Sequence, residues 1–280
     1  MCTKSETLPR SSSVTVPTIS KEGLPDHCLS IRVASDWGHF RRVGRTRTKQ
    51  TYRVIPRTTV AGLLAAIVGA DRDSYYGSFG SDNAAVAITP LTRLRTLNIP
   101  VTALGTDPGK SYSQTAGSRR SQLVRFQDTS GPRQIHVYET LVDPAYRIDV
   151  AVEDEAFYTA LREMLEDGES HYPPSLGLSE HLATVELLDT EAHPKPVTGD
   201  DPVVVDAVVP GTLQDVVPQP GVEYVTERSS AVMEAAGGGR RTTRFDDCVF
   251  TPSAETGVKV APADLEYPVA EVRGKTVVFR

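Results

Sequence analysis

The clearest helix signal in this chain lies in residues 51–69, which read TYRVIPRTTVAGLLAAIVG. Apolar residues recur there at the i, i+3, i+4, i+7 and i+8 positions of one buried helix face, and they are Val60, Leu63, Leu64, Ile67 and Val68. Thr58 or Thr59 is suited to cap the helix start, and Gly69 is placed to end it. The small residues between the apolar ones predict that this helix lies close against a sheet.

Strand patterns surround this helix. A segment of roughly alternating apolar and polar residues at 28–34 precedes it, and further strand patterns follow at 84–89, 91–104, 135–142 and 146–152. A second helix is expected over residues 153–167, stopped by Gly168, before a strand at 183–188. This order is that of a ferredoxin-like unit, so we predict an α+β fold with a ferredoxin-like domain over residues 27–190.

The two ends of the chain differ from this central part. Residues 1–26 are predicted to form a disordered tail, and residues 190–202, rich in Pro, Asp and Gly, are predicted to form a linker. Beyond the linker, short strand patterns dominate, so residues 200–280 are expected to be a strand-rich C-terminal region. Three glycines at 237–239 are predicted to form a hairpin tip between two of these strands.

Composition limits the classes of function. The formal net charge of the 280 residues is −6, which argues against a uniformly basic nucleic-acid binder. The cations are 23 Arg and only 7 Lys, a balance typical both of proteins from salt-loving organisms and of high-GC genomes. The three cysteines show no spacing of a disulfide framework or a zinc site. The longest apolar run is far shorter than the ~20 residues of a membrane span, and no secretory signal is evident, so we expect a soluble cytoplasmic protein without a membrane partner.

Cations gather in two places despite the acidic balance. The segment 36–57 combines them with aromatic and imidazole side chains, which suit phosphates and unpaired bases respectively. Its predicted RNA-binding residues are Trp37, His39, Arg41, Arg42, Arg45, Arg47, Lys49 and Tyr52, with Arg57 and Thr58 at the helix start, where free backbone N–H groups favour anions. A solvated basic loop, anchored by buried Trp37 and Phe40, is the alternative interpretation.

The second gathering is a long polar excursion at about residues 106–134. A segment of this length between strands is uncommon unless it is functional or disordered, and both interpretations stay open. Its predicted RNA-binding residues are Lys110, Arg119, Arg120 and Arg125. No catalytic motif, metal-ligand spacing or cofactor fingerprint is present, although His39 with Tyr52 or Lys49 could serve a metal-independent ribonuclease as general base and acid. We therefore predict no catalytic residues, no metal and no cofactor.

Two stretches of the sequence resemble a known family. The stretches are DWGHFRR at residues 36–42 and the helix-containing residues 51–69, and they resemble CRISPR-associated protein family five, of the RAMP superfamily, in the branch of haloarchaeal type I-B systems. The match covers residues 28–77 specifically, continues more loosely at 146–152 and 175–177, and weakens beyond residue 200. The resemblance implies a domain like the RNA-recognition motif, with an inserted β-hairpin thumb at about 106–134 and a strand-rich C-terminal part.

The resemblance also implies a function in antiviral defence. Members of this family hold the 5′ handle of crRNA in the Cascade surveillance complex, where they contact the backbone and large subunits and meet target DNA only through the assembled complex. One branch, in type I-C systems, cuts precursor crRNA with a Tyr, Lys and His set, but Lys110 has no adjacent His here. The leading hypothesis is therefore an RNA-binding subunit without turnover. The alternatives are a metal-independent endoribonuclease and a protein-interaction subunit with little RNA affinity of its own.

Overall fold

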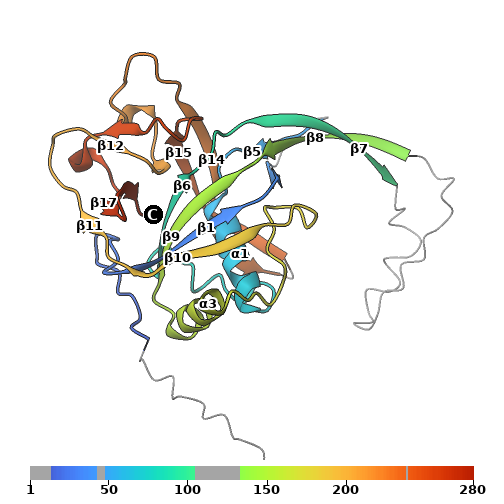
Figure 1. Cartoon of the computed structure of the whole chain (residues 1–280), viewed down its shortest axis with the longest axis horizontal. Helices are drawn as coiled ribbons and strands as arrows, with labels where there is room; N and C mark the ends of the chain where they lie inside the picture. The colour runs from blue at the N-terminus through green and yellow to red at the C-terminus, as the bar shows by residue number, and fades with distance from the viewer. Residues whose placement is uncertain (1–13, 43–47, 105–132, 238) are drawn as a thin grey trace, which may run out of the picture.

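The computed structural model describes residues 14–42, 48–104, 133–237 and 239–280. Its centre is a four-stranded antiparallel sheet in the order β10-β1-β9-β6 (Figure 1). These strands are β1 (Cys28–Ala34), β6 (Ala84–Pro90), β9 (Ala145–Val152) and β10 (Thr184–Ala192). Helix α1 (Arg57–Val68) joins β1 to β6 along the chain, and helix α3 (Glu155–Asp167) joins β9 to β10. The predicted α+β class is confirmed.

The two helices begin and end for local reasons. The N-cap of α1 is Pro56, which has no side-chain capping bond, so the expectation that Thr58 or Thr59 caps this helix is wrong. Asp154 caps α3 by accepting a hydrogen bond from the backbone N–H of Phe157 at 3.1 Å. Gly69 and Gly168 end the two helices, as expected, in the left-handed conformation that glycine tolerates without strain, with φ of 80° and 68°.

Each face of the central sheet is covered. On one face, Leu29, Ile31 and Val33 of β1 lie in a core with the apolar faces of α1 and α3. On the other face, Cys28 belongs to a second core built with residues of the C-terminal region, among them Phe279. An ion pair between Arg147 and Asp149 of β9 is buried at this second face, and Arg147 Nη2 also donates to the carbonyl oxygen of Val272 at 2.8 Å.

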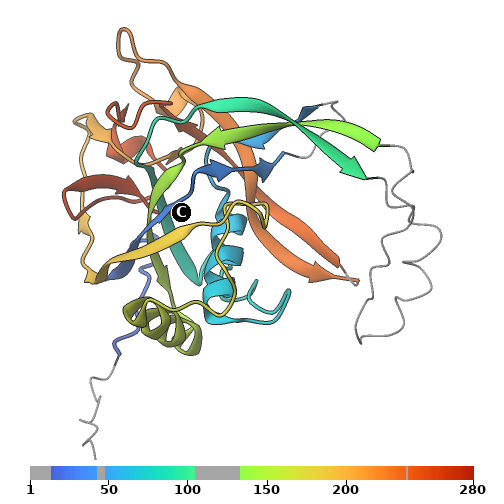
Figure 2. The same cartoon turned by 45° about the vertical axis from the view of Figure 1, so that its right-hand side comes forward.

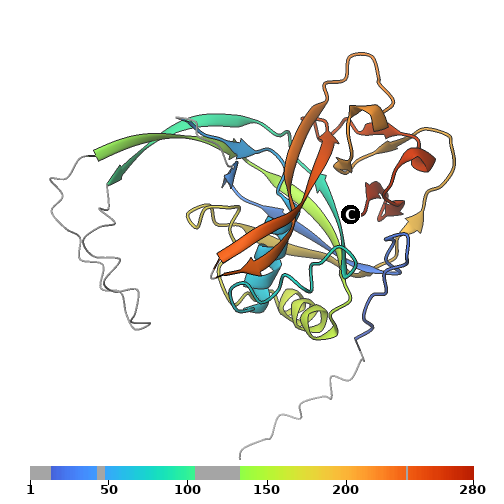
Figure 3. The ribbon, with the colours of Figure 1, turned by 180° about the vertical axis from the view of Figure 1, so that it is seen from behind.

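The C-terminal region consists of short strands and one long hairpin. The hairpin pairs β14 (Val225–Ala236) with β15 (Gly239–Phe250), the last pair being Ala236 with Gly239, and it lies in front of α1 in Figure 3. The short strands are β11 (Lys195–Pro196), β12 (Val203–Val205), β13 (Val209–Pro210), β16 (Val258–Val260), β17 (Val269–Val272) and β18 (Lys275–Val278). Because β11 pairs with β17, the segment expected to be a linker is part of a small sheet.

A second hairpin, β7 (Thr96–Leu104) with β8 (Arg133–Val142), projects from the central sheet (Figure 2). Two short strands pair with the other edge of β8: β2 (Trp37–Gly38) and β4 (Thr48–Lys49). Strand β3 (Phe40–Arg41) pairs with β5 (Thr51–Tyr52). The segment expected to be a polar loop before α1 is therefore largely fixed by strand pairing, while most of the expected thumb insertion at 106–134 lies outside the described residues.

Part of the predicted N-terminal tail follows a defined path. The backbone N–H of Ile19 donates to Glu153 Oε1 at 2.8 Å, and His27 Nε2 donates to the carbonyl oxygen of Thr15 at 3.1 Å. Residues 14–26 thus differ from the expected disorder because they bond to the chain around β1 and α3, and residues 1–13 lie outside the described residues. None of the described helices is long and apolar enough to span a membrane.

Candidate nucleic-acid interface

The candidate site is built on residues 36–57, which we call the basic segment. Pairing of β3 with β5 sets Phe40 opposite Tyr52 and Arg41 opposite Thr51, and the N–H of Arg42 donates to the carbonyl oxygen of Gln50 at 2.9 Å. These bonds place Arg41 and Arg42, which precede residues 43–47, beside the segment that follows those residues. That segment carries Lys49 and Tyr52. These side chains, which the sequence places in one predicted loop, are gathered at one surface by the strand pairing.

Four cations of the basic segment form no side-chain ion pair within the described part of the chain, although the charges of two of them, Arg42 and Arg53, act on the buried Glu227 and lower its pKa. The four are Arg41 and Arg42, which are exposed, and Lys49 and Arg53, which are half-buried. The guanidinium carbon of Arg42 lies 5.7 Å from the centre of the Tyr52 ring, a cation–π contact. Elsewhere in the described chain most exposed arginines are paired with carboxylates: Arg72, Arg95, Arg228, Arg241 and Arg273.

The buried carboxylate of Glu227, in β14 of the C-terminal hairpin, binds the backbone of the basic segment. Both carboxylate oxygens of Glu227 accept from the backbone N–H of Arg53 at 3.1 Å, and Glu227 is only 7% exposed. Burial raises the pKa of Glu227, while the N–H groups of Arg53 and Val54 and the charge of Arg42 act in the opposite direction. The hydroxyl of Tyr146 donates to the carbonyl oxygen of Arg53 at 2.6 Å. Both backbone groups of Arg53 are thus held by side chains.

A second carboxylate, Glu139 of β8, fixes the preceding residues. Its Oε2 accepts from the backbone N–H of Thr51 at 3.2 Å, and its Oε1 accepts from Thr96 Oγ1 at 3.2 Å. Thr51 Oγ1 in turn accepts from the N–H of Phe40 at 2.8 Å. Sequence reasoning missed Glu139 and Glu227 because they lie 88 and 174 residues from the groups that they bind, and neither belongs to a recognisable motif.

The two ring residues at the start of the segment lie in different environments. Trp37 on β2 is 39% exposed and is available to a ligand. His39 is 1% exposed; its Nδ1 donates to the carbonyl oxygen of Glu139 at 2.8 Å, and its ring centre lies 5.3 Å from that of Tyr138. Gly177 closes over the His39 backbone so tightly that a Cβ there would lie 1.9 Å from the His39 carbonyl oxygen. His39 is therefore enclosed, and the expectation that it contacts RNA from the surface does not fit its position.

Arg57 lies away from the surface that it was expected to share with the basic segment, and Thr58 is half-buried and bonded to β14. Arg57 is 1% exposed, and its five N–H donors all serve carbonyl oxygens, those of Phe79, Gly80, Ala84, Ala231 and Arg280. A guanidinium with every donor used has none left for a phosphate, so the structure assigns Arg57 a role in the fold instead. Burial lowers the pKa of Arg57 to about 10. Thr58 Oγ1 shares a hydrogen bond with Ser230 Oγ at 2.7 Å.

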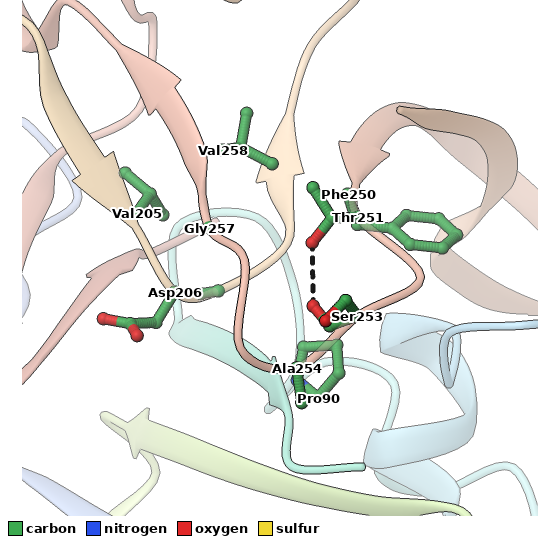
Figure 4. Close-up of a pocket in the computed structure, with 10 residues that line it drawn as sticks. Pro90, Val205, Asp206, Phe250, Thr251, Ser253, Ala254, Gly257 and Val258 are labelled. Atoms are coloured by element: carbon green, nitrogen blue, oxygen red, sulfur yellow. Dashed lines mark hydrogen bonds between the residues drawn. The ribbon is translucent and has the colours of Figure 1, made fainter. Parts of the chain in front are cut away.

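The remaining predicted residues lie outside the described part of the chain: Arg45, Arg47, Lys110, Arg119, Arg120 and Arg125. In the described part, no three His, Cys, Asp or Glu side chains gather as a metal site would require. The pocket between Pro90, Val205 and Thr251 has a volume of about 10 Å³, room for roughly one water molecule (Figure 4). A wider depression of about 290 Å³ lies beside Arg93 and Glu223, and it contains none of the predicted site residues.

Comparison with known proteins now gives the family. The family model described as CRISPR-associated protein (Cas_Cas5) matches residues 28–229. The chain belongs to this family. The match includes the basic segment and α1 and ends within β14, two residues after Glu227. A search of curated proteins finds no match.

Solved structures are similar to this Cas_Cas5 chain at low identity. A crystal structure of a CRISPR protein from Archaeoglobus fulgidus is 14% identical with a TM-score of 0.51, and the match covers 91% of this chain and 99% of that one. A chain of a CRISPR RNA-guided surveillance complex is 17% identical with a TM-score of 0.48, over 83% of this chain and 91% of that one. The likeness to the Archaeoglobus fulgidus protein supports the fold alone.

Proposed function

We propose that this Cas_Cas5 chain is a non-catalytic RNA-binding subunit of a CRISPR surveillance (Cascade) complex and holds the 5′ handle of crRNA. The observation that carries the proposal is the group of unpaired cations Arg41, Arg42, Lys49 and Arg53 beside Tyr52. In an acidic protein whose other exposed arginines are mostly neutralised by carboxylates, such a group is an anion-binding surface. The sequence stretches 36–42 and 51–69 support the finer assignment to the type I-B branch.

Two kinds of contact would hold the RNA. Guanidinium and ammonium groups neutralise phosphates, and the affinity then falls as the salt concentration rises. Tyr52 and Trp37 offer ring faces on which unpaired bases stack, a contact that salt screens far less. The carboxylates of Glu139, which is half-buried, and Glu227, which is buried, accept from the backbone N–H groups of Thr51 and Arg53 and so fix the backbone that carries these side chains.

The proposed fold family explains where the RNA would lie. We propose that the βαββαβ part is a ferredoxin-like domain, which the sheet order β10-β1-β9-β6 supports, and that β7 and β8 are the arms of its thumb. A domain like the RNA-recognition motif uses the open face of its sheet for RNA. Here the C-terminal region covers that face, with Val272 bonded to Arg147. The RNA surface is therefore proposed beside the sheet, on the basic segment.

The proposal includes partners and a compartment. We propose that the chain contacts the backbone and large subunits of the complex, takes part in antiviral defence, and meets target DNA only through the assembled complex. Cys28 and Cys248 carry buried free thiols, which fit a protein that functions in the reducing cytoplasm.

One experiment separates this proposal from its rivals. Purified protein is incubated with end-labelled repeat RNA in EDTA and analysed on native and denaturing gels. We expect a shifted, intact RNA, since His39, the imidazole considered for catalysis, is enclosed. A discrete cleavage product without metal would make the chain a processing ribonuclease. No shift, together with co-purification of other subunits, would make it a protein-interaction subunit.

A further inference from the structure

The two edge strands of the central sheet are β6 and β10 (Figure 1), and the edge at β6 is closed by the chain itself. The N–H of Val86 donates to the carbonyl oxygen of Arg280 at 3.1 Å, and the N–H of Arg280 donates to the carbonyl oxygen of Val86 at 3.2 Å. The N–H of Val208 donates to the carbonyl oxygen of Ile88 at 2.8 Å. Residues of the C-terminal region thus pair with the outward backbone groups of β6, and no other chain can add a strand there.

The hydrogen bonds of β1 show which backbone groups of β10 point away from the sheet. The N–H of Ser35 donates to the carbonyl oxygen of Pro144 at 3.1 Å, one step beyond the β1–β9 pair of Ala34 with Ala145. Hydrogen-bonded and non-hydrogen-bonded pairs alternate along an antiparallel ladder. Ala34 and Arg32 therefore direct their N–H and carbonyl groups away from β9 and toward β10.

Two residues of β10 have backbone groups that face outward. Glu186 lies opposite Arg32, so its N–H and carbonyl groups face β1, and those of its neighbours Val185 and Leu187 point away from the sheet. Among the described residues, none forms a hydrogen bond with these outward groups. The side chains of Val185 and Leu187 pack against the first core, so the strand is fixed in place. The β10 edge is therefore a rigid and open template for another strand.

The charge around the β10 edge limits what can pair with it. Residues 163–194 hold eight Asp and Glu and no Lys or Arg. Glu186 lies 3.7 Å from Arg32, but both side chains remain accessible to solvent, so the pair neutralises little. Nucleic acid would be repelled here, and a second copy of β10 would place carboxylates against carboxylates. A protein strand that carries Lys or Arg has the complementary charge.

We infer that the β10 edge binds an extended strand of a partner protein that carries Lys or Arg at alternate positions. This inference rests on the proposed function, in which the chain has protein subunits as partners. The added strand pairs with the outward N–H and carbonyl groups of Val185 and Leu187, and its cations lie beside Glu186. The contact uses no residue of the basic segment, so its loss can be measured separately from RNA binding.

Hydrogen–deuterium exchange on the unaltered protein tests this inference. The tagged chain is isolated with the subunits that co-purify with it, and its amides are compared with those of the free chain. We expect the amides of Val185 and Leu187 to exchange at least about tenfold more slowly in the complex, whereas the amide of Glu186, which is bonded to β1, is protected in both states. If the exchange of Val185 and Leu187 is the same in both states, the inference is wrong and the proposed function stands.

A matched pair of variants separates the backbone contact from side-chain packing. Val185→Pro and Val185→Ala both lose contacts with the core, but only proline removes the outward N–H, a change that an edge strand tolerates. We expect Val185→Pro to retain about tenfold less of the co-purifying subunits than Val185→Ala, while both bind repeat RNA equally. Equal retention by the two variants would overturn the inference.

The charge of the edge is tested by reversal. Glu186→Lys should reduce the co-purifying subunits, whereas Glu255→Lys, at an exposed position after β15, should not. Equal effects of these two variants would contradict a basic partner strand.

Three further outcomes are distinguishable. If the amides of Val185 and Leu187 become protected as the free chain is concentrated, the occupant is a second copy and the inference is wrong. If no subunit co-purifies but repeat RNA is still shifted, the inference is overturned and the RNA-binding role stands. If neither subunits nor RNA bind, both the inference and the proposed function are overturned.

Discussion

The guanidinium Nε of Arg57 donates to the carbonyl oxygen of Arg280 at 3.2 Å, across 223 residues of sequence. The other four donors of Arg57 reach the loop before β6, the first residue of β6 and the bulge of β14 at Ala231. The N–H and the carbonyl of Arg280 both bond to Val86 of β6. One buried cation thus joins the start of α1, the edge of the central sheet and two parts of the C-terminal region.

Replacing Arg57 should destabilise the protein as a whole. Arg57→Ala leaves five buried carbonyls without their donors, and one such group costs about 1–3 kcal/mol, so we expect a loss of at least ~3 kcal/mol in the free energy of unfolding. Arg57→Lys should recover little, because an ammonium has three donors and no planar fork. Urea unfolding measures both. Arg72→Ala is the control, since its side chain is 82% exposed with one surface ion pair; an equally small effect at Arg57 would contradict the assigned role.

Removing an unpaired cation should change the salt dependence of RNA binding. Arg42→Ala removes one phosphate contact and the cation–π contact with Tyr52, so we expect about tenfold weaker binding at low salt. The plot of log affinity against log salt should become shallower by ~0.7, the value for one contact to a single strand.

The matched control for Arg42 is Arg32→Ala. Arg32 lies on β1 and is paired with Glu186 at 3.7 Å, so its removal should leave the slope unchanged. Fluorescence anisotropy between low and high salt gives both slopes. Identical slopes for Arg42→Ala and Arg32→Ala would show that the unpaired group does not contact phosphates.

Local patterns predicted the parts of this fold that depend on nearby residues. The helix signal before Gly69 is correct because apolar spacing and a left-handed stop act within a few residues. The burial of Arg57 could not be predicted, since its acceptors come from segments scattered along the chain and an arginine next to a basic loop has the composition of a surface residue. The burial of His39 could not be predicted for the same reason, because Gly177, in a turn far away in sequence, encloses it.

The buried carboxylate of Glu227 predicts a pH dependence of stability. Its pKa in the folded state is raised above the ordinary 4.5, chiefly by burial, so the folded protein holds this proton more tightly than the unfolded chain does. The contribution of Glu227 to stability is therefore favourable at low pH and is lost as the pH rises from about 4.5 through the folded pKa. Glu227→Gln removes this dependence.

The free energies of unfolding of the wild type and of Glu227→Gln should be compared at several pH values between about 4 and about 8, a range that begins near the ordinary glutamate pKa and extends above it. As the pH rises, we expect the free energy of unfolding of the wild type to fall relative to that of the variant. The other titrating groups affect both proteins equally, so they cancel when one free energy is subtracted from the other. Glu234→Gln, at an exposed ion pair with Arg241, is the control. A difference that stays constant with pH would contradict the raised pKa.

The close approach of Gly177 to His39 gives the last prediction. Gly177→Ala combines a left-handed backbone, with φ of +94°, and a Cβ that would lie 1.9 Å from the His39 carbonyl oxygen. Gly168→Ala shares only the first strain, because its φ is +68° and its Cβ would meet nothing within 4 Å. A left-handed alanine costs ~1–2 kcal/mol, so Gly168→Ala should lose about that much and Gly177→Ala clearly more in urea unfolding. Only Gly177→Ala adds the backbone clash. Equal losses of unfolding free energy would mean that the turn at 175–177 can move away from His39 at no energetic cost, so that Gly177 does not keep His39 enclosed.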